Sequence, residues 1–571
     1  MNDTRSARIP PAFGLTMLAL CAGCPRGGGS AAPEASPATA VDAAVAGIRG
    51  EDLAAHVRVL ASDAFEGRFP GSAGEAKTVA YLSAHLAAHG FEPVVDGSYL
   101  QPVPLVSVTL RPDTGATLTG ASGPRALRVP DELVIGSPTP RARVELSDAE
   151  VVFAGHGIVA PEYGWDDYAG VDVRGKVVVV LPGDPGPQRA DREIFEGRAL
   201  SLHGTTAHKA ELAAARGAAA LLVLHDDAVG VPWDVFAQGA RLPHQQLEEG
   251  SGAAKVALQG MIPRSVLAGA LDDEGRRRLE ALQRGAIEDG FTARPLPLRL
   301  SISLAREVAP VVSHNVVGVL PGARRPHEHV IYTAHWDHVG RGDERDGDGI
   351  YNGAVDNATG TAALLELAEA FGSLPQRPDR SIVLVATTAE EQGLLGSTWY
   401  AEHPVLPLVD AVGVINMDAL FPFGETRGMT VVALGSSELD DYLADAARTV
   451  GRTLQPDPSP ELGAFFRSDH YPFAYRGVPA IFAVGGPAPG PGEAAELEPY
   501  VEFVTTRYHQ VGDEYDEATW DMGGIVQDTV VYFRAGHALA MDERRPQWSP
   551  GSPFRARHQA LRTAATTTAA R

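Results

Sequence analysis

Side chains that bind metals or transfer protons gather at the ends of apolar runs in the second half of the sequence. His335, the pair Glu390 and Glu391, and Asp418 each follow such a run, and Asp356 precedes a segment with helical spacing. If the runs are parallel strands, their carboxyl ends meet at one crevice, where open α/β sheets place their sites. A single residue of this kind is usually a cap or a loop residue, but four of these positions together predict one shared site.

The donor types favour a divalent metal ion. Imidazole and carboxylate ligands suit Zn²⁺, with Co²⁺ or Mn²⁺ as substitutes. The two cysteines, Cys21 and Cys24, lie near the start of the sequence, which excludes thiolate ligands in the body of the chain. The donors suffice for two ions, which need a bridging carboxylate and can share a hydroxide. One residue of the pair Glu390 and Glu391 can bind metal while the other acts as general base.

Apolar periodicity predicts the elements that hold these residues. From about residue 311, strands and helices alternate, which predicts an α/β fold with a mainly parallel central sheet and helices on both faces. Residues 113–305 have a different pattern, with short β-like runs and one helix at 206–219. The other predicted helices are 51–62, 75–89, 357–373, 438–449 and 523–541, and the strands are 330–333, 382–387, 412–415 and 480–484.

Composition narrows the class of protein. The 571 residues are 44% hydrophobic and 21% charged, as in soluble globular proteins, which excludes a wholly disordered chain and a polytopic membrane protein. The formal charge of −24 argues against nucleic acid as a partner. No Gly-x-Ser-x-Gly motif is present, so a serine hydrolase is disfavoured.

The first residues indicate export. Arg5 and Arg8 precede an apolar run at 12–22, and Ala22-Gly23-Cys24 resembles a bacterial lipobox. We expect a signal peptide of the lipoprotein type over 1–24 and a flexible tether over 25–47, with plain secretion as the alternative. Either route predicts an extracytoplasmic protein that meets a membrane only through a lipid anchor.

Several ordered motifs resemble those of the co-catalytic zinc aminopeptidases of the aminopeptidase Y type, metallopeptidase family 28. Together they span about 450 residues in the order of the family. They are 60–71 (LASDAFEGRFPG), 334–338 (AHWDH), 353–360 (GAVDNATG), 389–397 (AEEQGLLGS), 415–418 (INMD), 467–470 (RSDH) and 508–513 (YHQVGD).

The resemblance implies a set of metal ligands. One ion would be held by His335 and Asp418, the other by Glu391 and His509, and Asp356 would bridge the two. The implied cofactors are therefore two Zn²⁺ per chain in a zinc exopeptidase fold.

The same resemblance implies the catalytic residues. Glu390 would be the general base and then the general acid, and Asp337 would accept a hydrogen bond from the first histidine and fix its tautomer. Tyr508 and Arg467 are candidates for the oxyanion and the substrate termini. His338 is interpreted as a loop residue or as a residue behind the ligands, rather than as a ligand.

The middle of the chain resembles a protease-associated domain inserted into the peptidase. The similarity rests on 153–168 (FAGHGIVAPEYGWDDY) and 173–180 (VRGKVVVV). The expected organisation is 48–112 as the first part of the peptidase domain, 113–305 as the insertion, 306–545 as the main part and 546–571 as a disordered tail.

The predicted function is a metallo-aminopeptidase that removes N-terminal residues from peptides. A carboxypeptidase or dipeptidase on the same scaffold is the first alternative. A glutaminyl cyclase and a non-catalytic, receptor-like binding protein are weaker ones. The oligomeric state and the preferred residue at the cleaved bond stay open.

Overall fold

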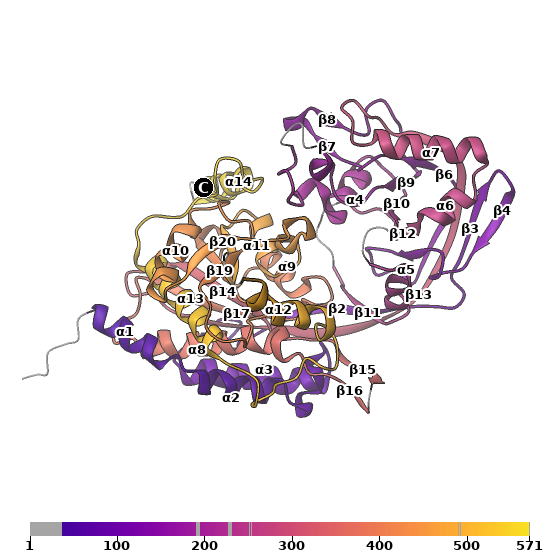
Figure 1. Ribbon diagram of the computed structural model, residues 1–571. Coiled ribbons are helices and arrows are strands. Elements are labelled where there is room, and N and C mark those ends of the chain that lie inside the picture. Colours follow the sequence, from indigo (N-terminus) through magenta and orange to yellow (C-terminus); the bar gives the residue numbers. More distant parts are fainter. Residues whose placement is uncertain are drawn as a thin grey trace, which may run out of the picture.

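One long strand, β13 (Arg294–Leu320), passes through both lobes of the molecule (Figure 1). The computed structural model describes residues 37–189, 194–226, 231–249, 252, 254–345, 347–488, 490 and 493–569. The first half of β13 pairs with β3 (Gly115–Gly120) and β6 (Arg143–Phe153) in the smaller lobe. Its last residues pair with β17 (Arg380–Thr387) in the larger lobe, so one strand fixes both sheets to each other.

The larger lobe contains a sheet with a parallel centre. β14 (Arg325–His335) pairs in parallel with β17 and with β18 (Ala411–Asn416), and β18 pairs in parallel with β21 (Ala480–Gly486). Antiparallel strands flank this centre, with β13 next to β17 and β19 (Gly428–Val431) next to β21. The predicted mainly parallel α/β sheet is therefore confirmed. The outer strands are β1 (Glu92–Pro93), β2 (Leu100–Leu110) and β20 (Thr453–Pro456).

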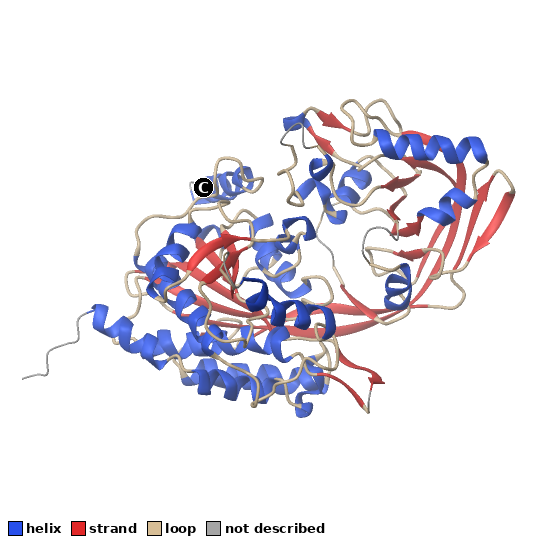
Figure 2. Ribbon diagram, in the orientation of Figure 1, coloured by secondary structure: helices blue, strands red, loops and turns tan. Residues whose placement is uncertain are grey.

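Helices cover both faces of this sheet (Figure 2). Alternate residues of a strand point to opposite faces, and Val330 and Tyr332 join one buried cluster while Ile331 joins another. The first cluster includes side chains of α1 (Pro37–Gly47), α2 (Gly50–Leu60), α3 (Ala73–Ala88), α8 (Gly360–Ser373), α10 (Leu439–Thr449) and α13 (Gly523–Met541). The second includes side chains of α9 (Leu395–Glu402) and α11 (His470–Tyr475).

The smaller lobe has its own sheet and its own cores. β9 (Val177–Val180) pairs in parallel with β6 and with β10 (Ala220–His225), and β10 pairs in parallel with β12 (Leu258–Pro263). The buried residues of its two main clusters all lie between 116 and 304. Its remaining main elements are β4 (Gly123–Leu127), β5 (Val134–Gly136), α4 (Thr206–Ala215), α6 (Arg264–Gly269) and α7 (Asp273–Gly285), and β11 (His244–Leu247) pairs with β2 between the lobes. This lobe lies in the range expected for the insertion, 113–305, and its assignment as an inserted domain stays a prediction.

The predicted tether over 25–47 is wrong from residue 37 onward, because α1 occupies that stretch. Its alanines favour a helix, and Val41, Ala44, Val45 and Ile48 recur at helical spacing and pack on the main cluster. The predicted signal and lipidation segment, including Cys24, lies outside the described residues and stays a prediction. Among the described helices, none combines the length and the apolar character that crossing a membrane requires.

The predicted disordered tail is also wrong over 546–569, the part of it that the structure describes. Trp548 is 1% exposed, its indole nitrogen donates to the carbonyl of Gly477 at 3.1 Å, and Phe554 is buried beside it. Helix α14 (Arg555–Ala569) follows these two residues. The segment is rich in Pro, Arg, Ala and Thr, which suggested disorder. Its two aromatic side chains, Trp548 and Phe554, nevertheless pack in the second cluster.

Replacing Trp548 with alanine should therefore destabilise the larger lobe. We expect the free energy of unfolding to fall by about 3–5 kcal/mol, the usual cost of truncating a buried tryptophan. Gln559→Ala, at an exposed position of α14, is the matched control and should change it by less than about 0.5 kcal/mol. Denaturant unfolding compares the two variants. Equal stabilities would show that the segment is not docked.

Candidate metal centre

The predicted site residues converge where the parallel strands end. His335 is the last residue of β14, Glu390 and Glu391 follow β17, and Asp418 follows β18. The register sets His335 opposite Thr387, so the glutamates emerge next to the histidine. Two further residues come from other segments: Asp356 lies in the π-helical turn Ala354–Thr359 before α8, and His509 follows α12 (Glu493–Thr506).

Asp356 lies between the two histidines. Its Oδ1 is 3.3 Å from His335 Nε2, and its Oδ2 is 3.0 Å from His509 Nε2. His335 Nε2 is also 3.1 Å from Asp418 Oδ1, and His509 Nε2 is 2.9 Å from Glu391 Oε2. Each histidine thus has one further carboxylate, and Asp356 offers one oxygen to each side. This is the arrangement that a carboxylate bridging two cations requires.

The adjacent glutamates have pKa values that are shifted in opposite directions. Burial raises the pKa of Glu390 well above its usual value against the opposing influence of His335, and the carboxylates of Asp418 and Glu391 act in the same direction as burial. Burial and Asp356 would also raise the pKa of Glu391, but imidazoles on both of its oxygens lower it to about 2. Glu390 is therefore suited to hold a proton and Glu391 to stay ionised, the division that paired acid and base residues use.

The donor set fits divalent cations. Two groups of donor atoms, each within 4.8 Å of one another, form at the site: His335, Glu390 and Asp418 in one, and His338, Asp356 and Glu391 in the other. Buried carboxylates are costly unless positive charge compensates them. Glu391 Oε1 is buried without a hydrogen-bond partner. Imidazole and carboxylate donors in this number suit Zn²⁺, Co²⁺ or Mn²⁺.

Two residues hold the turn that carries Asp356. The carboxylate of Asp513 accepts hydrogen bonds from the amides of Val355 and Asp356, at 2.9 and 3.0 Å. The guanidinium of Arg68 is buried and donates to the carbonyls of Gly353, Asn352, Trp336 and Leu60. Arg68 lies in the motif 60–71, and Asp513 lies in the motif 508–513. The sequence did not indicate that they support this turn, because they bind backbone groups that are distant in the chain.

Asp418 is positioned in a similar way. Ser468 Oγ donates to Asp418 Oδ2 at 2.5 Å, and the side-chain amide of Asn416 donates to Ser468 Oγ at 2.6 Å. The next residue, Asp469, is fully buried and accepts a hydrogen bond from the hydroxyl of Thr387. In the motif 467–470, Ser468 therefore positions the ligand Asp418, and Arg467 lines the cleft described below.

The predicted contact of the Asp337 carboxylate with His335 is wrong. His335 Nδ1 lies 3.2 Å from the backbone carbonyl of Asp337 and 3.9 Å from its Oδ1. The carbonyl is therefore the acceptor that fixes the tautomer of His335. The Asp337 carboxylate instead accepts from the amide of Glu390 at 3.1 Å, and burial raises its pKa to about 8.

His338 is fully buried, and its Nδ1 lies 2.6 Å from Glu391 Oε1 without hydrogen-bond geometry. It is therefore no surface loop residue. His338 and His509 face different oxygens of Glu391, and the interpretation of His338 as a residue behind the ligands stays a prediction.

A cleft of about 770 Å³ opens onto the site. Glu390, Glu391, Tyr508 and His509 line it, and so does the exposed side chain of Arg467. The smaller lobe contributes Ala207, Glu211 and Gly252 to the same lining. Tyr475 of the larger lobe donates to Glu211 at 2.9 Å, so the two lobes are in contact at the edge of the cleft.

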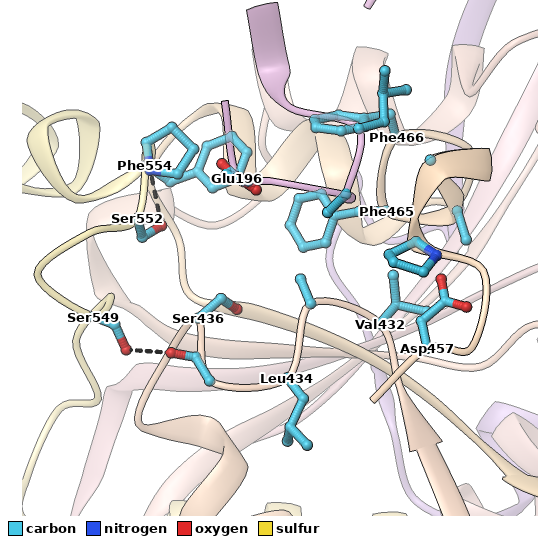
Figure 3. A pocket seen from close by; sticks show the side chains of 18 of the residues that line it. Glu196, Val432, Leu434, Ser436, Asp457, Phe465, Phe466, Ser549, Ser552 and Phe554 are labelled. Carbon is cyan, nitrogen blue, oxygen red and sulfur yellow. Dashed lines mark hydrogen bonds between the residues drawn. The ribbon is translucent and has the colours of Figure 1, made fainter. Parts of the chain in front are cut away.

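Figure 3 shows a second cavity, of about 440 Å³, whose lining includes Phe466. Phe466 also lines the cleft at the metal centre. Phe465, Leu434 and Phe554 make much of the wall of the second cavity apolar, and Ser549 donates to the carbonyl of Gly435 at its rim. Its described lining includes carboxylates but no histidine, lysine or cysteine. This cavity therefore lacks the donor set of the metal centre.

Comparison with known proteins agrees with this geometry. Residues 315–534 match the sequence profile described as "Peptidase family M28". This segment carries every predicted ligand, and the match confirms the resemblance to this family that the motifs indicated.

The curated relatives include proteins named as aminopeptidases and proteins named as probable glutamate carboxypeptidases. Aminopeptidase YwaD of Bacillus subtilis is 30% identical over 220 residues, which cover 37% of this chain and 44% of the relative. Probable glutamate carboxypeptidase LAMP1 of Arabidopsis thaliana is 33% identical over 172 residues, covering 29% of this chain and 23% of the relative. The chain thus spans less than half the length of these relatives.

Among solved structures, the aminopeptidase from Aneurinibacillus sp. strain AM-1 is 18% identical and covers 90% of this chain and 97% of its own, with a TM-score of 0.48. Since that score is low, the fold class rests on the strand order described above.

Proposed function

We propose that the chain is a metallo-aminopeptidase that hydrolyses the first peptide bond of substrates with a free N-terminus, using two divalent cations, with zinc as the expected metal. The observation that carries this proposal is the position of Asp356, with one oxygen within 3.3 Å of each of two histidines. His335 and Asp418 would hold one ion, and Glu391 and His509 the other.

The bound cations would polarise the scissile carbonyl and lower the pKa of water to about 7. The protein itself moves the proton. Glu390 lies beside the donors without being needed as a ligand, and its raised pKa allows it to accept a proton from water and pass it to the leaving amine. The amide hydrogen bond to Asp337 fixes the backbone of Glu390 beside the donors.

Tyr508 is proposed as a donor to the oxyanion. Its ring stacks on His509 with centroids 3.9 Å apart. Burial, together with the carboxylates of Asp356 and Glu391, raises the pKa of Tyr508 above its usual value, so the hydroxyl keeps its proton at neutral pH and can donate it.

Tyr508→Phe should lower kcat by about 10²–10³, the usual cost of losing one oxyanion donor, and leave metal content unchanged. Tyr515→Phe, at a tyrosine that lies against Arg58 and Trp520, is the matched control. Steady-state kinetics measure the effect. A Tyr508→Phe rate within twofold of the parent would remove this role.

A carboxypeptidase is the second candidate, because probable glutamate carboxypeptidases are among the relatives and Arg467 could bind a substrate carboxylate in the cleft. A decayed, receptor-like protein is disfavoured by the complete donor set.

Paired peptides separate the two activities. The aminopeptidase proposal predicts cleavage of a peptide with a free amine and an amidated C-terminus, and at least about 10²-fold slower cleavage of its N-acetylated, free-acid counterpart, whose N-terminus is blocked. Chromatography of the products measures both rates. The opposite preference would support the carboxypeptidase and overturn the proposal.

We also propose that the smaller lobe, as a protease-associated domain, restricts access to the cleft. Its support is the presence of Ala207, Glu211 and Gly252 in the cleft lining. An extracytoplasmic location, with a lipid on Cys24, is proposed from the N-terminal sequence pattern alone.

A further inference from the structure

A second group of histidines and carboxylates lies on the helical face of the larger lobe, outside the candidate metal centre. His85 and His89 come from the end of α3, and Glu369 comes from α8. Donor atoms of these three residues all lie within 4.8 Å of one another. A spacing of four residues places both histidines on one face of α3, as in metal sites built across two helices.

More titratable groups continue this cluster into the protein. The ring of His56, from α2, lies 4.7 Å from that of His85, and the ring of His89 lies 4.4 Å from His85 on the other side. His56 Nδ1 contacts the hydroxyl of Tyr81 at 2.6 Å, and its Nε2 faces Glu366 at 3.6 Å. Three helices thus contribute to one connected polar network inside an otherwise apolar interface.

Glu366 is a buried carboxylate of this network without a direct hydrogen-bond partner. Its side chain is 1% exposed, and neither of its carboxylate oxygens has a hydrogen-bond partner. A buried, unpartnered carboxylate is costly, and a divalent cation beside it would offset the charges of Glu366 and Glu369.

His85 is prepared to act as a ligand. Its Nε2 is buried without a hydrogen-bond partner, and such an imidazole nitrogen can offer its lone pair to a metal ion.

The helices are packed closely at this point. A Cβ at Gly372 of α8 would lie 2.4 Å from the carbonyl of His89, so the glycine allows the end of α3 to approach α8. Since α8 begins directly after the turn that carries Asp356, a ligand here would link the N-terminal helices to the element that supports the candidate metal centre.

We propose that His85, His89 and Glu369 form a separate site for a divalent transition metal, with zinc as the expected ion and His56 and Glu366 as the layer behind the ligands. Tetrahedral zinc separates its ligand atoms by about 3.4 Å, so small side-chain rotations from the observed spacing would bring the three ligands into range, with a water molecule in the fourth position. We propose a structural role for this site, because its ligands join α3 to α8 and Glu366 and His56 lie on the side away from solvent. The inference does not depend on the proposed peptidase activity.

Zinc binding to the full-length chain tests this site. In the background His335→Ala/His509→Ala, which disables the candidate metal centre, we expect one equivalent of Zn²⁺ to remain after gel filtration, measured by mass spectrometry of the metal. Adding His85→Ala and His89→Ala should remove that equivalent, whereas adding His327→Ala, at an exposed histidine, should not. Loss of all zinc in the background, or its retention after the histidine pair is removed, would overturn the proposal.

A milder variant keeps the test valid if those proteins fail to fold. Glu369 is 45% exposed, and Glu369→Gln preserves its shape. In the otherwise unchanged chain, Glu369→Gln should weaken zinc binding at this site by at least about 10-fold and reduce the zinc-dependent rise in Tm, while peptide hydrolysis stays as in the parent. An unchanged affinity and Tm response in Glu369→Gln would contradict the site.

Discussion

Glu390→Gln is expected to abolish turnover while leaving the metal ions and the fold in place. Glutamine has nearly the same shape but cannot take a proton from water, so we expect kcat to fall by about 10²–10⁴, the contribution of a positioned general base. The bound metal should stay at the parent level, because each ion keeps its own histidine and carboxylate. Initial rates on a peptide with a free amine, together with metal analysis, measure both properties.

The control for this variant is Glu517→Gln, at a glutamate whose side chain is 80% exposed. It should leave both the rate and the metal content unchanged. A Glu390→Gln protein that works within a few-fold of the parent would assign the proton transfer to another residue. Loss of metal from Glu390→Gln would instead make Glu390 a ligand.

Asp356→Asn is expected to affect both ions at once. Its two oxygens face different histidines, and the amide that replaces one of them is neutral and a poor ligand. We expect the metal content of the centre to fall by at least one ion per chain. The rate should fall by about 10³-fold or more, since metal ions stabilise the transition state by several kcal/mol and about 1.4 kcal/mol corresponds to tenfold.

Asp441→Asn, at an exposed aspartate of α10, is the matched control and should keep the parent metal content. Circular dichroism checks that the Asp356 variant folds, because Asp513 still binds the backbone of the turn through two amides. If Asp356→Asn retains its metal and its activity, the carboxylate does not bridge.

The parts of the fold that could be predicted are those with strong local periodicity. Helix α13 has the predicted bounds 523–541, and the four parallel strands enclose the predicted runs. The site followed from the same signal, because the residue after an apolar strand must lie at the edge of the sheet. His335 next to Thr387 illustrates how register then brings distant residues together.

The parts that could not be predicted depend on contacts between distant segments. Strand β13 is 27 residues long and contains prolines and charges, since it crosses from one sheet to another and its burial changes along the way. Arg68 donates to carbonyls as far as 285 positions along the chain. Trp548 is buried only because the groove that receives it comes from elements remote in sequence, and composition could not reveal this groove.

Anomalous diffraction at the zinc absorption edge, from crystals of the full chain grown with zinc, tests the two-ion centre. We expect two peaks about 3.5–4 Å apart on either side of the Asp356 carboxylate, one near His335 and Asp418 and the other near Glu391 and His509. A single peak there, or none, would contradict the two-ion centre.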